Sequence, residues 1–177
     1  MSEIKIIKTE ELRDRMGELH VGDRVLLSGR IFTARDAAHN RINAMLDSGE
    51  TLPFELRDSV IYYAGPTPAK NGLAVGSCGP TTSSRMDVFS PRFIENGMVG
   101  MIGKGQRSPA VIEAMKKYGA VYFCAIGGAG ALASKAIKSC EVIAFPELGC
   151  ESIKRMEIEN LALIVGIDSD GNSIFDR

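Results

Sequence analysis

The densest group of chemically useful side chains lies in one short segment. Four hydroxyl side chains stand in a row and a basic residue follows them: Thr81, Thr82, Ser83, Ser84 and Arg85. One hydroxyl is enough to cap a helix, and an arginine alone suits a surface position, but three hydroxyls then remain unexplained. A helix that starts near Ser83 would present free backbone N–H groups, hydroxyls and a guanidinium to one anion. The segment is therefore predicted to bind an anion.

Two further basic residues stand in comparable places. Arg35 falls in the first turn of a helix expected over residues 34–46, where a positive charge opposes the helix dipole and needs an anion, or its neighbour Asp36, as partner. His39 lies on nearly the same face and is more typical of a structural hydrogen-bonding group than of a proton-transfer group. Lys104 stands between two glycines, which would let its ammonium approach an anion closely, although an exposed turn lysine is the simpler alternative.

The three basic residues each lie where an expected strand gives way to a loop or helix. Short apolar runs predict strands over residues 24–33, 60–63 and 98–102, the first of them bent at its internal glycine. In layered α/β folds such junctions gather at one edge of the sheet. Three cations at one edge suit a small substrate with two carboxylates, which forked guanidinium–carboxylate pairs would orient.

The remaining elements alternate between strand and helix, which predicts an α/β fold. Residues 1–22 are expected to form an N-terminal helical segment with Thr9 as its cap, and Ser108 is expected to cap a helix that stops at Gly119. Further strands are expected at residues 121–126, 142–145 and 161–167. Because more strands follow one another in the first half, we expect a mixed sheet. No linker or repeat interrupts residues 1–177, so a single domain is expected.

Composition excludes several classes of function. The chain has 177 residues, of which 45% are hydrophobic and 24% charged, as in an ordinary folded domain. Lys and Arg number 21 against 22 Asp and Glu, so the basic excess of a general nucleic-acid-binding surface is missing. No apolar stretch reaches the length of a membrane span, and the first residues carry no apolar signal-peptide core. We expect a cytoplasmic protein that binds neither nucleic acid nor membrane.

The cysteines do not form a metal-binding pattern. They stand at Cys78, Cys124, Cys140 and Cys150, without a C-x-x-C pair, and the two histidines are far apart. A zinc or iron–sulfur site built by this chain alone is therefore not expected, and no metal ligand is assigned. Free thiols in a reducing compartment are the expected state.

A glycine motif offers a function of a different class. Residues 128–133 fit G-x-G-x-x-G/A between a buried strand and a helix, and Glu147 follows 19 residues after Gly128, where a ribose-binding acid belongs. The motif comes late in the chain, and too few residues follow it for a full dinucleotide-binding sheet. A tight packing turn is the simpler interpretation. A nucleotide-binding α/β module that uses Gly128 to Gly130 is kept as the alternative.

Five segments taken together resemble a known family. They are LLSGRIFTARDAAH (26–39), YYAGPTP (62–68), GPTTSSRMD (79–87), IGKG (102–105) and FPELGCESI (145–153). In this order they resemble the β subunit of iron–sulfur-dependent hydro-lyases, the family of class I fumarase and L(+)-tartrate dehydratase. The resemblance implies reversible hydration of fumarate to (S)-malate, with tartrate dehydration left open as the alternative. It reduces the Gly128 motif to a packing turn.

The resemblance also implies a fold, a partner and a cofactor. The β part of these enzymes is a swivelling β/β/α domain, which works with an α subunit, here expected as a separate chain in a dimer of αβ pairs. The α subunit carries a [4Fe-4S] cluster, one iron of which binds the substrate and acts as a Lewis acid.

The family's site residues transfer by motif. Arg35, the stretch from Thr81 to Arg85, and Lys104 match the positions that hold the dicarboxylate. Thr81 matches the residue implicated, with an α-subunit aspartate, in proton transfer at carbon. Asp36 and His39 also match, and we assign them to the support of Arg35.

Overall fold

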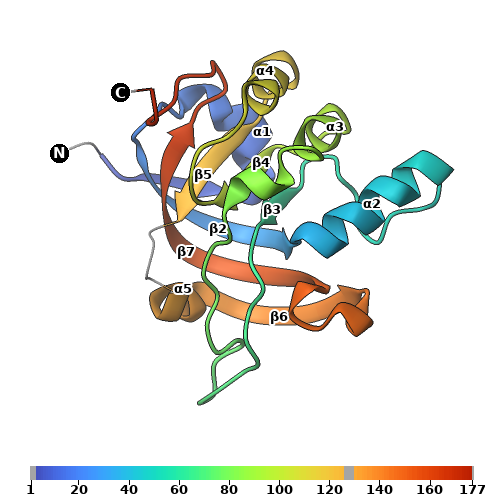
Figure 1. Ribbon diagram of the computed structural model, residues 1–177. Coiled ribbons are helices and arrows are strands. Elements are labelled where there is room, and N and C mark those ends of the chain that lie inside the picture. Colours follow the sequence, from blue (N-terminus) through green and yellow to red (C-terminus); the bar gives the residue numbers. More distant parts are fainter. Residues whose placement is uncertain (1–2, 126–129, 177) are drawn as a thin grey trace.

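The computed structural model describes residues 3–125 and 130–176 (Figure 1). Within these residues seven strands form one sheet in the order β1-β2-β3-β4-β5-β7-β6. Their bounds are β1 (Lys5–Lys8), β2 (Arg24–Thr33), β3 (Val60–Tyr62), β4 (Gly100–Gly103), β5 (Val121–Ala125), β6 (Ile137–Ala144) and β7 (Ile153–Ile167). The mixed α/β architecture is confirmed.

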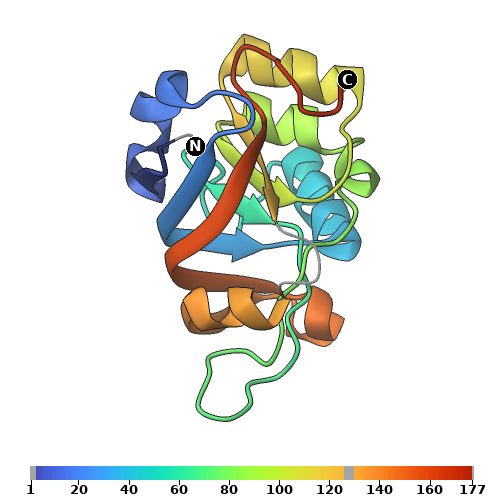
Figure 2. The same ribbon diagram turned by 90° about the vertical axis from the view of Figure 1, so that its left-hand side faces the viewer.

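The sheet closes into a barrel because β7 pairs with both β5 and β2. It runs antiparallel to β5 on one edge and antiparallel to β2 on the other, so β2, β3, β4, β5 and β7 form a ring. Strand β1 adds to the first half of β2, and β6 adds to the first half of β7 (Figure 2). The bend expected in β2 is present as a register shift between Leu27 and Gly29.

Helices cover the barrel unevenly. The α-helices are α1 (Leu12–Arg15), α2 (Asp36–Ser48), α3 (Ser90–Glu95), α4 (Pro109–Tyr118) and α5 (Gly130–Ala136), and the 3₁₀ helices are η1 (Thr9–Glu11), η2 (Met16–Glu18), η3 (Ser83–Met86) and η4 (Pro146–Glu151). Helices α2, α3 and α4 lie on one side of the sheet, whereas α5 lies beside β6 (Figure 1). The cap of α4 is confirmed, since Ser108 Oγ accepts from the Val111 N–H at 3.4 Å. No helix in the described residues is long and apolar enough to cross a bilayer.

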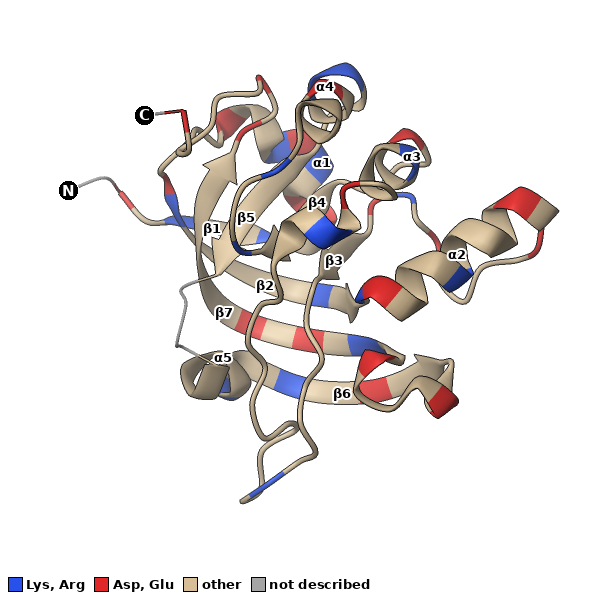
Figure 3. Cartoon of the chain, viewed as in Figure 1, with Lys and Arg blue, Asp and Glu red and all other residues tan. Residues whose placement is uncertain are grey.

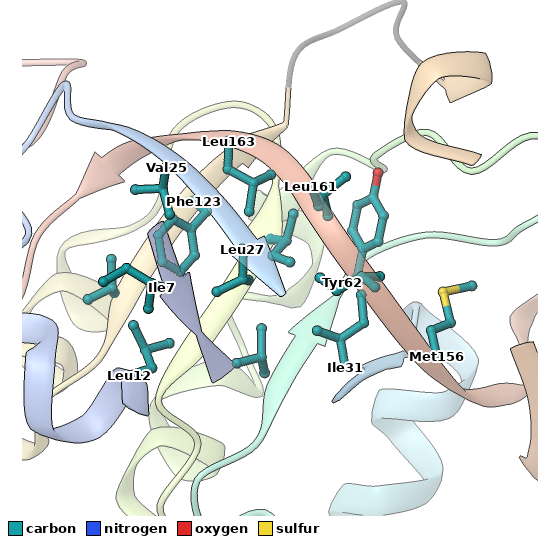
Figure 4. Packing of buried hydrophobic residues seen from close by; sticks show 14 of the residues in the cluster. Ile7, Leu12, Val25, Leu27, Ile31, Tyr62, Phe123, Met156, Leu161 and Leu163 are labelled. Carbon is teal, nitrogen blue, oxygen red and sulfur yellow. The ribbon is translucent and has the colours of Figure 1, made fainter. Parts of the chain in front are cut away.

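The core has two parts, because successive side chains of a strand point to opposite faces. One part joins residues of the barrel strands, such as Leu27, Tyr62 and Phe123, with Ile7 and Leu12 of the N-terminal segment (Figure 4). The other lies under α2, α3 and α4. It takes alternate residues of the same strands, such as Ile61, Met101 and Tyr122, together with Tyr63, which directly follows β3. The strand ends that lead into the helices are therefore fixed from both faces.

The sheet is mixed, as expected, because of one strand: β7 is antiparallel to β2, β5 and β6, whereas β1 to β5 are all parallel in their pairings with one another. Two expectations about the N-terminal segment were wrong in detail. Thr9 does not cap a helix; its Oγ1 accepts from the Arg30 N–H at 3.1 Å and so fastens η1 to β2. The N-terminal segment also contains a strand, β1, whose four residues were too few to give a pattern.

Candidate functional site

The predicted site residues meet where β2, β3 and β4 end. Arg35 follows β2, Lys104 follows β4, and the segment from Thr81 to Arg85 returns to the end of β3, where the Thr81 N–H donates to Tyr63 O at 2.6 Å. Thr82 pairs with Lys104 in a parallel bridge. Because these ends share one edge of the sheet, residues 35, 81–85 and 104 are brought together as the sequence predicts (Figure 3 shows this face coloured by charge).

An ion pair joins the first two loops. Arg85 Nε donates to Asp36 Oδ1 at 3.1 Å, and its Nη2 lies 2.9 Å from Oδ2. The Arg85 side chain is 54% exposed, so its outer N–H groups still face solvent. Asp36 therefore neutralises Arg85 and not its neighbour Arg35, for which it was one of the two partners considered from the sequence.

Ser83 differs from its hydroxyl neighbours because it is fully buried. Its Oγ accepts from the Lys104 N–H at 3.1 Å and from the Tyr122 hydroxyl at 2.9 Å. A Cβ at position 103 would lie 1.9 Å from this oxygen, which explains why a glycine precedes Lys104. The Ser83 N–H also donates to Lys104 O at 2.9 Å, so it is not the free helix-terminal donor that the sequence predicts. Thr82 and Ser84 are exposed, and Thr81 is half-buried.

Arg35 is held with an unsatisfied donor. It occupies the cap position of α2, and its buried Nε has no hydrogen-bond partner among the described residues. The nearest carboxylate oxygen is Glu151 Oε1, at 3.9 Å from Nε. Gly65 packs against the guanidinium, since a Cβ there would lie 3.0 Å from Nη1. The charge of Arg35 is thus only loosely balanced inside the chain.

His39 supports the backbone at Arg35. Its ring is fully buried, stacks on Phe93 at 5.1 Å between centroids, and places Nδ1 2.8 Å from Arg35 O. Because a carbonyl only accepts, Nδ1 carries the proton, and Nε2 has no partner within residues 3–125 and 130–176. Burial lowers the pKa of His39 to about 4, so the ring is neutral at pH 7. This contact fits the supporting role assigned from the sequence.

A buried lysine that the sequence analysis missed holds the neighbouring turn. The Lys154 ammonium lies within 3.2 Å of Gly149 O, Cys150 O and Ser152 O, and 2.8 Å from Ser152 Oγ. Burial lowers its pKa. These bonds fix η4, and with it Glu151 beside Arg35. A lysine inside an apolar strand pattern was the available signal.

A buried ion pair beneath the hydroxyl segment was also missed. Arg107 Nε donates to Asp87 Oδ1 at 2.7 Å, and the arginine side chain has no exposed surface. Asp87 stands at the end of the resembling segment 79–87, but Arg107 looks like any charged loop residue in the sequence.

The cysteines do not form a metal site in the described part of the chain. No three His, Cys, Asp or Glu side chains there lie close enough to hold a metal ion. Cys78 is buried, and burial raises the pKa of its thiol to about 12; burial also raises the pKa of Cys124 and Cys140, while Cys150 is exposed. These residues do not fit a [4Fe-4S] cluster.

The glycine motif does not have the surroundings of a dinucleotide site. Gly128 and Ala129 lie outside the described residues, and Gly130 is the first residue of α5. Strand β7 stands between β5 and β6 and runs antiparallel to both, unlike the adjacent parallel strands of a dinucleotide fold. Glu147, the expected ribose-binding acid, pairs instead with Arg41 at 2.5 Å.

The described residues thus form a closed mixed barrel that gathers three basic side chains, Arg35, Arg85 and Lys104, at its strand ends. Comparison with known families gives a match over residues 1–177 to the family described as Fumarase C-terminus. The chain belongs to this family.

Relatives of two lengths match the chain. It is 42% identical over 166 residues to the putative L(+)-tartrate dehydratase subunit beta of Methanocaldococcus jannaschii, covering 90% of this chain and 85% of that protein. It is 40% identical over 170 residues to fumarate hydratase 2 of Leishmania major, and 39% over 170 residues to the aerobic class I fumarate hydratase of Escherichia coli K12. Each of these two covers 95% of this chain, which in turn spans only 30% and 31% of their lengths.

Proposed function

We propose that this chain is the β component of a class I fumarate hydratase, which hydrates fumarate reversibly to (S)-malate together with a [4Fe-4S]-bearing α subunit. Family membership supports a hydro-lyase. The observation that carries the proposal is the loosely balanced cation group at one sheet edge, above all the buried Arg35 Nε, which has no hydrogen-bond partner in the part of the chain that the structure describes. A dicarboxylate would supply the missing acceptors.

The proposed roles follow from exposure and charge. Arg35 and Arg85 bind the two substrate carboxylates through forked pairs, and Lys104 adds a point charge. The exposed hydroxyls of Thr82 and Ser84 lie beside the same proposed substrate-binding position. Substrate binding requires Arg85 to share its guanidinium between Asp36 and a carboxylate, for which its exposed N–H groups leave room.

Thr81 is proposed to move the proton at the substrate carbon. A threonine hydroxyl is a poor base alone, so the proposal requires a charged neighbour, an aspartate of the α subunit. Ser83 was expected to touch the substrate. Its burial favours a different role, in which it fixes the turn that carries Lys104.

The cluster is proposed to reside in the partner. The described side chains of this chain do not form a site that fits the cluster. The names of relatives that this chain nearly spans, both called subunit beta, support a two-chain enzyme. We further propose a dimer of αβ pairs in the cytoplasm, in which this domain swivels to close over the substrate.

L(+)-tartrate dehydration is the second candidate. The chain covers 85% and 83% of the two tartrate dehydratase beta subunits, compared with 30% and 31% of the two fumarate hydratases. Tartrate and (S)-malate are both four-carbon dicarboxylates that differ by one hydroxyl group, so they place the same demand on the arginines.

Reconstitution tests the proposal. The chain is combined anaerobically with its α subunit, and fumarate hydration, malate dehydration and tartrate dehydration are assayed side by side. We expect turnover of fumarate and malate by the complex and none by this chain alone. Turnover by the chain alone would refute the two-component assignment, and faster turnover of tartrate would replace fumarate as the substrate.

A further inference from the structure

A buried cation lies directly under the proposed substrate loops. Arg107 stands three residues after Lys104 and its side chain is 0% exposed, while its partner Asp87 stands two residues after Arg85 and is 12% exposed. The second Asp87 oxygen accepts from the Ser108 N–H at 2.7 Å. One carboxylate thus ties the end of the hydroxyl segment both to Arg107 and to the start of α4.

The other N–H groups of Arg107 reach a third and a fourth element. Nη2 donates to Ser90 Oγ at 2.8 Å and lies 3.3 Å from the Tyr63 hydroxyl. The guanidinium carbon lies 5.2 Å from the Tyr63 ring centroid and 4.9 Å from that of Tyr122. It is therefore in contact with one aromatic ring that directly follows β3 and with another near the start of β5.

Tyr122 connects Arg107 to the proposed substrate-binding loops. Its hydroxyl lies 2.9 Å from Ser83 Oγ and 2.8 Å from Gly105 O, and Ser83 Oγ accepts the Lys104 N–H. The turn around Lys104 and the segment around Ser83 are thus held by one aromatic hydroxyl, whose ring is fixed by Arg107.

Stability alone does not explain such a group. Taking an ion pair out of water is costly, and apolar side chains of similar volume commonly stabilise a fold at least as well. Burial opposes the charged form of Arg107, but the nearby Tyr63 and Asp87 outweigh it and raise its pKa, so the charge persists. A forked, planar cation gives directional contacts to several loops at once, which apolar side chains cannot do.

We propose that Arg107, with Asp87 and Tyr122, is a positioning group that sets Lys104 and the Thr81–Arg85 segment in the geometry for substrate binding. It touches no substrate itself. The inference rests on the proposed function for the identity of the substrate, but its subject is the placement of the loops.

Two variants and one control test this role in the reconstituted complex. Arg107→Lys keeps the charge and loses the fork, and Tyr122→Phe keeps the ring and loses only the hydroxyl. Arg13→Lys is the matched control, since Arg13 binds Asp58 and Gly97 O at the opposite ends of β3 and β4. KM, kcat and the folded fraction from urea unfolding are measured for each.

A positioning role and a merely stabilising role give different results. Lost stability lowers the number of active molecules and leaves KM unchanged. Misplaced loops raise KM and lower kcat per folded molecule, and we expect a loss of kcat/KM of about 10²-fold for Arg107→Lys and about 10-fold for Tyr122→Phe. Arg13→Lys should leave both constants unchanged.

The inference fails if the folded Arg107→Lys and Tyr122→Phe complexes keep the KM and kcat of the wild type. If Arg107→Lys does not fold, Tyr122→Phe alone decides, because it removes a single oxygen atom. A wild-type complex that turns over neither fumarate nor tartrate would instead refute the proposed function, which the wild-type assay tests separately.

Discussion

The outer face of β2, β7 and β6 and the edge where β2, β3 and β4 end are both rich in charge, but their charges are balanced differently. On the outer face Arg30 stands opposite Glu157, and Arg155 stands opposite Glu141, in the strand register itself. Their ion pairs measure 3.1 and 2.5 Å. The register of the sheet thus gives each of these four charged side chains a partner of opposite sign.

At the ends of β2, β3 and β4 the charged side chains lie in loops, where cross-strand pairing does not place opposite charges beside each other. The buried Nε of Arg35 finds no acceptor among the residues that the structure describes. Arg85 pairs with one carboxylate, that of Asp36, while more than half of its side chain stays exposed. An open groove of about 1080 Å³ runs along the paired outer face, so a hollow alone does not identify a binding site. Incomplete neutralisation is the better guide, because a charge without a partner gains most from a ligand.

The largest expected effect comes from removing a clamp arginine. Arg35→Ala or Arg85→Ala should cost about 2–5 kcal/mol in kcat/KM, as for truncation of one partner of a desolvated charge pair. Arg→Lys should restore little, because lysine cannot form the fork. Steady-state kinetics of the complex measure this. Near-normal kinetics in either alanine variant would make that arginine a structural residue only.

The next effect concerns stability and pH. The pKa of His39 is lowered from 6.5 to about 4 in the folded chain, so the unfolded chain binds more protons between these values. Stability is therefore full above pH 6.5 and falls as the pH drops toward 4, by about 3 kcal/mol in all. Urea unfolding across this range measures the slope.

His39→Phe keeps a ring against Phe93 and should remove that part of the slope, whereas His20→Gln should leave it in place. The same slope in wild type and His39→Phe would show that another group binds the proton.

A smaller effect separates two neighbouring hydroxyls. Thr81→Val should lower kcat by about 10²-fold, the range for loss of an acid–base group, while the arginines keep substrate affinity nearly unchanged. Thr82→Val should have the milder effect. Turnover is measured together with hydrogen exchange at the malate carbon. A larger loss of kcat in Thr82→Val would assign the proton-transfer role to Thr82. Unchanged hydrogen exchange in both variants would assign that role to the α subunit.

The smallest effect is expected on the outer face. Arg155→Ala removes an exposed cross-strand pair and should cost less than about 1 kcal/mol of stability. Its kcat/KM should equal that of the wild type. A loss comparable with that of Arg35→Ala would mean that the paired outer face also serves substrate binding. Incomplete neutralisation of charge would then not distinguish the binding region from the outer face.

Much of the site could be predicted because its signals are local. The hydroxyl run, the glycine-flanked Lys104 and the helix start at Arg35 each occupy one short segment, and the segments meet because parallel strand ends share an edge. The direct roles of these residues stay predictions, since geometry places them without measuring chemistry.

The rest depends on contacts between distant segments. Ser83 has the same appearance in the sequence as Ser84, yet Tyr122 and Lys104 surround one and solvent the other. The late strand was expected over residues 161–167 but covers Ile153–Ile167, because its first half gains partners on both edges, from β2 and β6. Barrel closure has no local signal, because it is a pairing between the second strand and the last.

That closure has a consequence for how the chain folds. The Lys154 N–H donates to Thr33 Oγ1, which lies 121 positions earlier in the chain. Strand β2 pairs with β7 along its length, so this edge of β2 has no partner until β7 is in place. During synthesis one edge of β2 therefore stays open until the final strand emerges, a non-local step of the kind that slows folding and exposes a sheet edge to other chains. The turn that carries Glu151 directly precedes β7, so the surroundings of Arg35 become complete only in that last step.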